Sequence, residues 1–289
     1  APEYVAQYNQ AAQPQFSVGE YWDNSTATKL WVNGTKVNNV PQSAVFDFPF
    51  RYTVRDAANS GDWSKLENGS NAPLINSRQF RQYAVTFVEN HDTQTRSASE
   101  PLDPIKKDTL AANAYLLAMP GTPCVFYRHW LDHKQAIKAM IEVRRAAGVV
   151  NTSVPTIVSR EPKQYVVSVA GTKGTLLCVL GDEAENYAPD ATQYVKVLSG
   201  QHYAYFLSRS TNALLLDKPS GEYEAAFTAR VTSVSESKQT LVYTTDGTVP
   251  TAQSLRVPAD GNISITQDAT LQVGVLSAEG EVSNVVSRI

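Results

Sequence analysis

Short apolar runs alternate with stretches of helical periodicity over the first half of this chain, residues 1–147. Four runs predict strands that are buried on both faces, because they are almost continuously apolar; they are 16–19, 44–48, 84–88 and 123–127. The periodic stretches predict helices over 3–12, 50–58, 107–119 and 134–147. Such an alternation is typical of a parallel sheet with helices packed outside it.

Four strand-and-helix units amount to half of an eight-stranded (β/α)8 TIM barrel, which normally needs about 250 residues. After Gly148 the pattern changes to β-rich runs at 165–169, 175–180 and 194–198, which predict an antiparallel sheet. A third unit starts near Pro219, where an alternating strand and an Asp246-Gly247 turn predict a small β-sandwich. The predicted fold class is therefore α/β plus all-β, with a half-barrel over 1–148, an antiparallel β-sheet domain over 149–218 and a β-sandwich over 219–289.

Composition narrows the function classes. With 289 residues, 42% of them hydrophobic, the chain can bury a substantial core in two or three domains. The net charge of −3 comes from 25 basic and 28 acidic residues without a Lys/Arg block, so we expect no nucleic-acid partner. No apolar run approaches the roughly 20 residues that span a bilayer, and residues 1–10 lack the features of a signal peptide. We expect any targeting sequence to have been removed or to lie outside these residues.

The two cysteines, Cys124 and Cys178, lie in separate apolar runs. This placement favours two buried free thiols over a disulfide.

A carboxylate flanked by aromatic residues follows the first predicted strand, in the order Gly19, Glu20, Tyr21, Trp22. The carboxyl ends of parallel barrel strands form the face on which active sites are built. Partial desolvation by the neighbouring rings would favour the neutral carboxyl that a general acid needs, and the rings can stack on a sugar. The alternative is that Glu20 is a rim residue or a salt-bridge partner.

The third predicted strand leads into Asn90, His91 and Asp92 at the same face. Such a cluster can hold sugar hydroxyls in charge-assisted hydrogen bonds, and its carboxylate can stabilise an oxocarbenium-like centre. The alternative is structural: Asp92 caps a helix and His91 is satisfied within the fold.

Together these segments resemble glycoside hydrolase family 13, the α-amylase family. The resemblance follows that family's fifth to eighth strands in order, in the segments Gly19-Glu20-Tyr21-Trp22, Val45-Phe46-Asp47-Phe48-Pro49-Phe50, Phe87-Val88-Glu89-Asn90-His91-Asp92 and Pro120-Gly121-Thr122-Pro123-Cys124-Val125-Phe126-Tyr127. It covers residues 1–148, and 149–210 fits the antiparallel domain that follows the barrel in α-amylases. The resemblance thus implies the C-terminal half of the barrel and retaining hydrolysis of α-1,4-glucan (starch or maltodextrin). It also implies site residues: Glu20 as general acid/base, Asp92 with it in catalysis, and His91, Tyr21 and Trp22 in substrate binding.

Two motifs of the family do not occur in these residues. The nucleophile lies in a Gly-x-Arg-x-Asp segment of the fourth strand and an Asp-x-x-x-Asn-His motif marks the third, and both would precede Ala1. A retaining mechanism needs two carboxylates, so we expect this chain alone to be inactive and the missing N-terminal half of the barrel to be a partner. The structural calcium typical of α-amylases is held mainly by those missing segments, so the resemblance assigns no cofactor or metal here. Arg128 is a departure, since many relatives carry an acidic residue at this place.

Further residues have alternative readings. Trp31, Trp63 and Trp130 are sugar platforms or packed loop residues, and His129 and His133 are a metal pair only if both lie on one helix with a further ligand.

The last unit resembles the small sandwich modules related to the C-terminal unit of chitobiases. Beyond Gly221 its aromatic residues are Tyr223, Phe227 and Tyr243, and a sandwich core could use all three, which favours a spacer over a starch binder.

Three functions remain open: a secreted, periplasmic or cell-surface α-amylase, a non-catalytic glucan-binding protein derived from one, and a fragment that closes its sheet with another chain.

Overall fold

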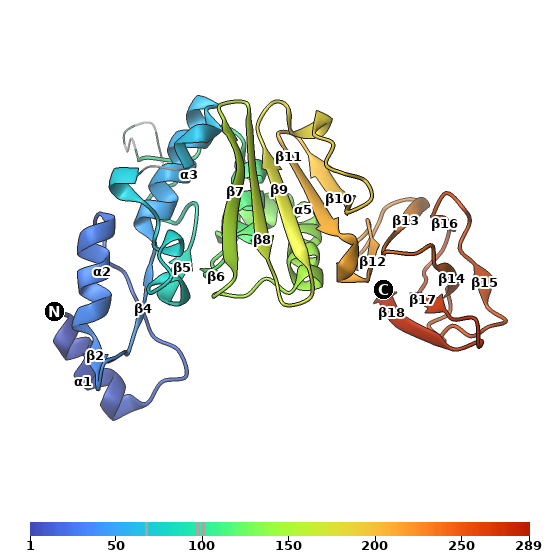
Figure 1. The fold of residues 1–289 in the computed structure, drawn as a ribbon, viewed down its shortest axis with the longest axis horizontal. Coiled ribbons are helices and arrows are strands. Elements are labelled where there is room, and N and C mark those ends of the chain that lie inside the picture. The colour runs from blue at the N-terminus through green and yellow to red at the C-terminus, as the bar shows by residue number, and fades with distance from the viewer. Residues whose placement is uncertain (67–68, 96, 98, 100–101) are drawn as a thin grey trace.

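The computed structural model describes residues 1–289 except 67–68, 96, 98 and 100–101. Three parts follow one another along the longest axis of the molecule, with the N-terminus at one end (Figure 1). The fold is mixed α/β with several sheets.

The first part is built on a four-stranded parallel sheet with the order β1-β4-β5-β6. Its helices and strands are α1 Pro2–Ala12, β1 Val18–Gly19, α2 Ser25–Gly34, β2 Lys36–Val37, β3 Val40–Pro41, β4 Ala44–Phe46, α3 Phe48–Ser60, β5 Ala84–Thr86, α4 Thr109–Ala118, β6 Thr122–Pro123 and α5 Tyr127–Ala147. Short 3-10 helices occur at η1 Trp63–Leu66, η2 Gly69–Asn71, η3 Leu74–Asn76 and η4 Arg81–Tyr83. All four strands and all four helices predicted from the sequence are present.

Two of the strands, β4 and β6, end earlier than predicted, and a helix begins soon after each of them. Asp47 caps α3 by accepting a hydrogen bond from the Phe50 N–H (3.2 Å), so Phe48 and Pro49 form the first helical turn and not a strand. Tyr127 likewise begins α5. The prediction that all four strands are buried on both faces is wrong for β1 and β6, whose Val18 and Thr122 are exposed, because these two are the edge strands of the sheet among the described residues.

The second part is a five-stranded antiparallel sheet with the order β10-β11-β9-β8-β7. Its elements are β7 Val154–Glu161, β8 Gln164–Ala170, β9 Thr175–Leu180, η5 Ala184–Asn186, β10 Tyr194–Gly200, β11 Tyr203–Ser208 and η6 Arg209–Thr211. Alternate side chains separate the two faces of this sheet. Tyr165 and Val167 join the large core formed with α4 and α5, which lie behind the sheet in Figure 1, whereas Val166 belongs to a small cluster on the other face.

Buried polar contacts connect α4 to α5 and to the antiparallel sheet. The Arg144 guanidinium donates to the carbonyls of Leu117 (2.9 Å) and Met119 (2.5 Å), which satisfies the C-terminal end of α4. The Tyr205 hydroxyl donates to the Ala114 carbonyl within the same core. The Arg144 contacts join α5 to the end of α4, and the Tyr205 contact joins the antiparallel sheet to α4.

The third part contains a three-stranded sheet, β12-β13-β16, and a four-stranded sheet, β15-β14-β17-β18. The strands are β12 Ala213–Leu216, β13 Phe227–Val234, β14 Thr240–Thr244, β15 Leu255–Arg256, β16 Asn262–Ile265, β17 Leu271–Leu276 and β18 Val282–Arg288. β12 lies before residue 219 yet pairs with β13, so this sheet begins earlier in the chain than the predicted third unit.

Both cysteines are free thiols, but only Cys178 is buried. The prediction that Cys124 is buried is wrong, because β6 ends at Pro123 and Cys124 lies on the exposed edge of the sheet.

Candidate active site

Parallel pairing gathers the predicted site residues at one edge of the first sheet. β1 pairs with β4 and β4 with β5, all parallel, so the segments that follow these strands leave the sheet in the same direction. Glu20 follows β1, Asp47 follows β4, and residues 87–92 follow β5. One strand separates those that lead to Glu20 and Asp92, which places the two strand axes about 10 Å apart.

Aromatic contacts connect the same three segments. The ring centroids of Trp22 and Phe48 lie 4.4 Å apart, and those of Phe48 and Phe87 lie 5.0 Å apart at an interplanar angle of 82°. Phe48 is fully buried and Trp22 is 47% exposed, so the chain of rings runs from the interior to the surface. The segments after β1, β4 and β5 are therefore in direct contact.

Glu20 and its two aromatic neighbours have distinct environments. Glu20 is exposed, and its Oε1 accepts a hydrogen bond from Trp22 Nε1 (2.7 Å). Tyr21 stacks on Trp31 with the ring centroids 6.2 Å apart, so it packs toward α2. The exposed ring next to the carboxylate is thus that of Trp22. The Glu20 carboxylate thus lies at the surface beside the Trp22 ring, and its aromatic neighbours do not enclose it.

His91 and Asp92 lie together in a turn over residues 91–93. His91 Nε2 is 3.2 Å from Asp92 Oδ2, and the Asp92 N–H donates to Asn90 Oδ1 (3.0 Å). No helix begins at Asp92, so the helix-cap alternative does not apply, and the His91 side chain is 75% exposed. Asn90 holds the turn, and the side chains of His91 and Asp92 reach the surface.

A buried network directly precedes this turn, and the sequence reasoning missed it. Glu89 Oε1 accepts a hydrogen bond from the Ile105 N–H (2.8 Å), and Glu89 Oε2 lies 3.0 Å from His129 Nε2. His129 Nδ1 lies 3.2 Å from Asn113 Nδ2, and that amide group also donates to the Thr109 carbonyl (2.8 Å). Since Asn113 Nδ2 is a donor, His129 Nδ1 accepts and Nε2 carries the proton that faces Glu89.

Glu89, Asn113 and His129 are all buried, and they come from three elements: the segment after β5, helix α4 and helix α5. The network fixes the start of the segment that carries His91 and Asp92. Because Glu89 also accepts the Ile105 N–H, it holds the later part of the same segment, just before α4. The metal-pair alternative for His129 and His133 is not supported, because His129 bonds Glu89 while His133 lies at a kink of α5 (φ −134°, ψ 29°).

The far end of the same segment is fixed to α3. Arg51 is fully buried, and its Nη1 lies 2.9 Å from Asp103 Oδ2. Asn59, two turns further along α3, accepts from the Lys106 N–H (2.6 Å) and donates to the Pro104 carbonyl (3.0 Å). Burial lowers the pKa of Arg51 to about 10, so the guanidinium stays charged at neutral pH.

Asp47 lies between the strands that lead to Glu20 and Asp92, but it is fully buried. Its carboxylate accepts from the N–H groups of Phe50 (3.2 Å) and Leu74 (2.8 Å). Burial raises the pKa of Asp47 to about 7, although these backbone hydrogen bonds oppose the shift. Asp47 and Glu89 are therefore both engaged in structural contacts, and neither is placed to act as a nucleophile.

The described residues contain no group of three or more His, Cys, Asp or Glu side chains that could hold a metal ion. Over the same residues, no helix is long and apolar enough to cross a membrane. Trp63 is fully buried, and Trp31 and Trp130 pack against the core, which favours the structural reading of all three.

Comparison with known proteins identifies relatives of this chain. Over 222 residues it is 30% identical to "Probable alpha-amylase 2" of Arabidopsis thaliana. The match covers 70% of this chain and 50% of that protein. Over 202 residues it is 30% identical to "Glucan 1,4-alpha-maltotetraohydrolase" of Stutzerimonas stutzeri, covering 64% of the chain and 36% of that protein. The chain thus spans half or less of the length of these two relatives.

Solved structures show the same fold. The crystal structure of Gamma-CGTASE from Alkalophilic bacillus clarkii matches 99% of the chain and 50% of its own length, with a TM-score of 0.50 at 16% identity. The family described as "Chitobiase/beta-hexosaminidase C-terminal domain" matches residues 218–287. Most of this chain is therefore similar to part of proteins named as α-amylases and maltotetraohydrolases, and residues 218–287, called the chitobiase-type domain below, match the C-terminal domain family of chitobiases and beta-hexosaminidases.

Proposed function

We propose that this chain is the C-terminal part of a retaining glycoside hydrolase that cleaves α-1,4-glucan such as starch or maltodextrin. One observation carries the proposal: the segments after β1 and β5 meet through the Trp22, Phe48 and Phe87 rings, with Glu20 on one of them and His91 and Asp92 on the other. This arrangement places two separate carboxylates at the surface of one sheet edge.

The residues take complementary roles in this proposal. Glu20 donates a proton to the glycosidic oxygen and later accepts one from water, and the Trp22 N–H orients its carboxylate. The exposed ring of Trp22 stacks on a glucose unit, while Tyr21 supports the same segment by stacking on Trp31. Asp92 and His91 bind sugar hydroxyls, and the Asp92 charge stabilises the oxocarbenium-like transition state.

The attacking carboxylate comes from a second part of the barrel in this proposal. The described strands β1 and β6 are the two edges of the parallel sheet, so each leaves one side open for a further strand. A barrel closed by four more strands would cover both edges and would bring a Gly-x-Arg-x-Asp carboxylate next to β1. We infer that the 289 residues alone do not hydrolyse starch.

The test uses the complete enzyme, in which this chain follows a segment that contains Gly-x-Arg-x-Asp. Glu20→Gln removes the proton donor and Asp92→Asn removes the stabilising charge, so each variant should reduce turnover by about 10² or more. Glu185→Gln, in the 3-10 helix η5 of the second part, changes an exposed carboxylate outside the candidate active site; it is the matched control and should retain full turnover. Hydrolysis at the wild-type rate by either site variant would refute the role of that residue. A complete enzyme that binds maltodextrin without cleaving it would support the non-catalytic alternative.

A further inference from the structure

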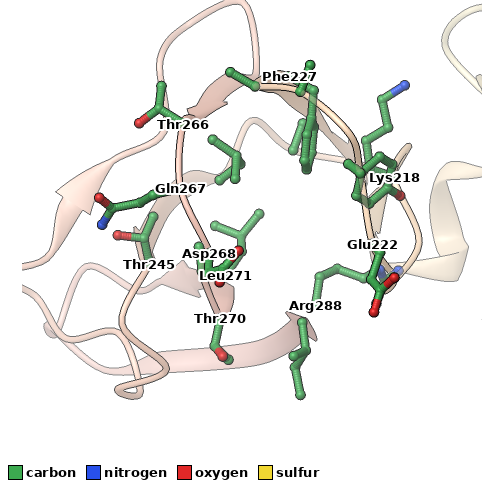
Figure 2. A pocket seen from close by; sticks show the side chains of 18 of the residues that line it. Lys218, Glu222, Phe227, Thr245, Thr266, Gln267, Asp268, Thr270, Leu271 and Arg288 are labelled. Carbon is green, nitrogen blue, oxygen red and sulfur yellow. The ribbon is translucent and has the colours of Figure 1, made fainter.

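The chitobiase-type domain contains an open pocket of about 1000 Å³, far along the chain from the candidate active site (Figure 1; Figure 2). One wall is formed by residues 218–227, which lead into β13, and the opposite wall by the connection between β16 and β17 together with Thr245. Ligand sites in proteins have similar volumes and combine apolar surface with a few polar groups that fix orientation.

A fixed aromatic ring lies on the first wall. The ring centroids of Tyr223 and Phe227 are 4.3 Å apart, and the Tyr223 hydroxyl donates to the Pro219 carbonyl (2.5 Å). Phe227 packs on the core of the domain, whereas Tyr223 is half-buried and lines the pocket. The Tyr223 ring is thus held at two points before any ligand binds, so little side-chain entropy is lost on binding.

The opposite wall presents hydroxyl, amide and carboxylate groups. Its polar side chains, seen to one side of the pocket in Figure 2, are those of Thr245, Thr266, Gln267, Asp268 and Thr270. Backbone hydrogen bonds hold this wall, because the Thr270 N–H donates to the Thr245 carbonyl (3.1 Å) and the Gly247 N–H donates to the Thr270 carbonyl (3.0 Å). The two walls of the pocket therefore differ in chemistry: one carries the Tyr223 and Phe227 rings, and the other carries residues with hydroxyl, amide and carboxylate groups.

The base of the pocket is tied to helix α5. Arg288, which lines the pocket, forms an ion pair with Glu142 of α5, and the Gly221 N–H donates to the Ile289 carbonyl (2.9 Å). Lys138 Nζ of α5 donates to the Ser220 carbonyl (2.8 Å). These contacts hold the pocket in one orientation on the rest of the chain.

Charge selects the class of ligand. The lining carboxylates Glu222, Glu224, Asp246 and Asp268 outnumber the lining cation Lys218, and the Arg288 guanidinium is already paired with Glu142, so the pocket disfavours an anion. An apolar ligand would leave the polar groups of the opposite wall without partners. A neutral ring with one apolar face and hydroxyls at its edge fits both walls, since its face covers Tyr223 and its hydroxyls meet Thr245, Asp268 and Thr270.

We propose that this pocket binds a neutral oligosaccharide, with Tyr223 as the stacking platform and Asp268 as the principal hydrogen-bonding group. The site is separate from the candidate active site, and binding at it does not require hydrolysis.

The experiment is calorimetric titration of the intact 289-residue chain with maltotetraose, cellotetraose and chitotetraose, which distinguish the sources of such a sugar. At least one should bind with a dissociation constant in the millimolar range or below. Tyr223→Ala and Asp268→Ala should each weaken that binding at least tenfold, whereas Tyr223→Phe, which keeps the ring, should retain most of it. Asp268 lies in an exposed turn, so its variant tests the site even if Tyr223→Ala unfolds the domain.

Two controls make the result specific. Tyr8→Ala removes an exposed aromatic ring at the other end of the chain and should leave binding unchanged. Trp22→Ala removes the exposed ring of the candidate active site, so binding that survives it is not located there. The proposal is overturned if none of the three sugars binds. It is also overturned if Asp268→Ala and a folded Tyr223→Ala both bind the sugar with the wild-type affinity. Neither outcome bears on hydrolysis, because the readout is binding alone.

Discussion

Glu89 provides the sharpest test of how the candidate active site is held in place. Replacement by Ala removes two hydrogen-bond partners inside the protein: the acceptor of the Ile105 N–H and the acceptor that faces His129 Nε2. Each buried donor left without a partner costs about 1–3 kcal/mol, and the void left by the side chain adds to this. We therefore expect Glu89→Ala to lower the free energy of unfolding by about 3–5 kcal/mol, which corresponds to a fall of roughly 10 °C in Tm.

Glu89→Gln should lose less stability, about 1–2 kcal/mol, because its Oε1 can still accept from the Ile105 N–H. Its amide N–H would require His129 Nε2 to act as an acceptor, which moves the ring proton to Nδ1. That proton would then face Asn113, whose buried Oδ1 makes no hydrogen bond with the described residues and could accept it if the amide turned. The turn would take the donor away from the Thr109 carbonyl, so the rescue is partial.

Thermal unfolding and the nitrogen chemical shifts of His129 measure the two effects. The expected order of stability is wild type, Glu89→Gln, Glu89→Ala, with the exposed control Glu185→Ala within about 0.5 kcal/mol of wild type. His129 should carry its proton on Nε2 in the wild type and on Nδ1 in Glu89→Gln. The reasoning fails if Glu89→Ala is as stable as the control, or if the His129 tautomer is the same in both proteins.

Two further predictions concern buried titratable groups. Burial raises the pKa of Asp47 from 3.8 to about 7. Between these two pH values the folded state keeps the Asp47 proton, whereas the unfolded state loses it. The contribution of Asp47 to the free energy of unfolding is therefore complete below about pH 4, and it falls by up to about 4 kcal/mol as the pH rises through 7. Asp47→Asn cannot ionise, so its stability relative to wild type should increase between pH 4 and pH 8 in denaturant titrations, and a difference that does not change with pH would contradict this assignment. For the thiols, a disulfide reagent should modify the exposed Cys124 of the native chain and leave Cys178 unmodified until denaturant is added, and equal reaction rates of the two would refute their placement.

The sequence predicted most of the fold of the first part because its signals are local. Apolar runs and helical periods identified four strands and four helices, but the strand ends were placed too late. Asp47 and Phe126 begin helical turns inside apolar runs, and such runs do not distinguish a strand from the start of a buried helix. Helix α2 was missed because it holds β-branched and aromatic residues such as Thr28, Trp31 and Val32, which have weak helix propensity; the Asn24 cap, which accepts from the Ala27 N–H, was its only clear signal.

The site could be predicted only as far as motifs reach. Glu20, His91 and Asp92 follow strands, so their position at one sheet edge follows from parallel pairing. The partnership of Glu89 with His129 joins residues 40 positions apart and exists only because β5 and β6 are neighbours in the sheet. Tyr223 shows the same limit: its sequence context is compatible with a core residue, and only its contacts reveal a ring that faces a pocket.

A reducing-sugar assay on the purified 289-residue chain tests the central claim most directly. The chain is assayed with starch alone, and again after addition of a separately expressed N-terminal half that carries Gly-x-Arg-x-Asp. We predict background activity for the chain alone, because a retaining mechanism needs a second carboxylate, and activity after addition that is lost again when the chain carries Glu20→Gln. Robust hydrolysis by the chain alone would contradict the account.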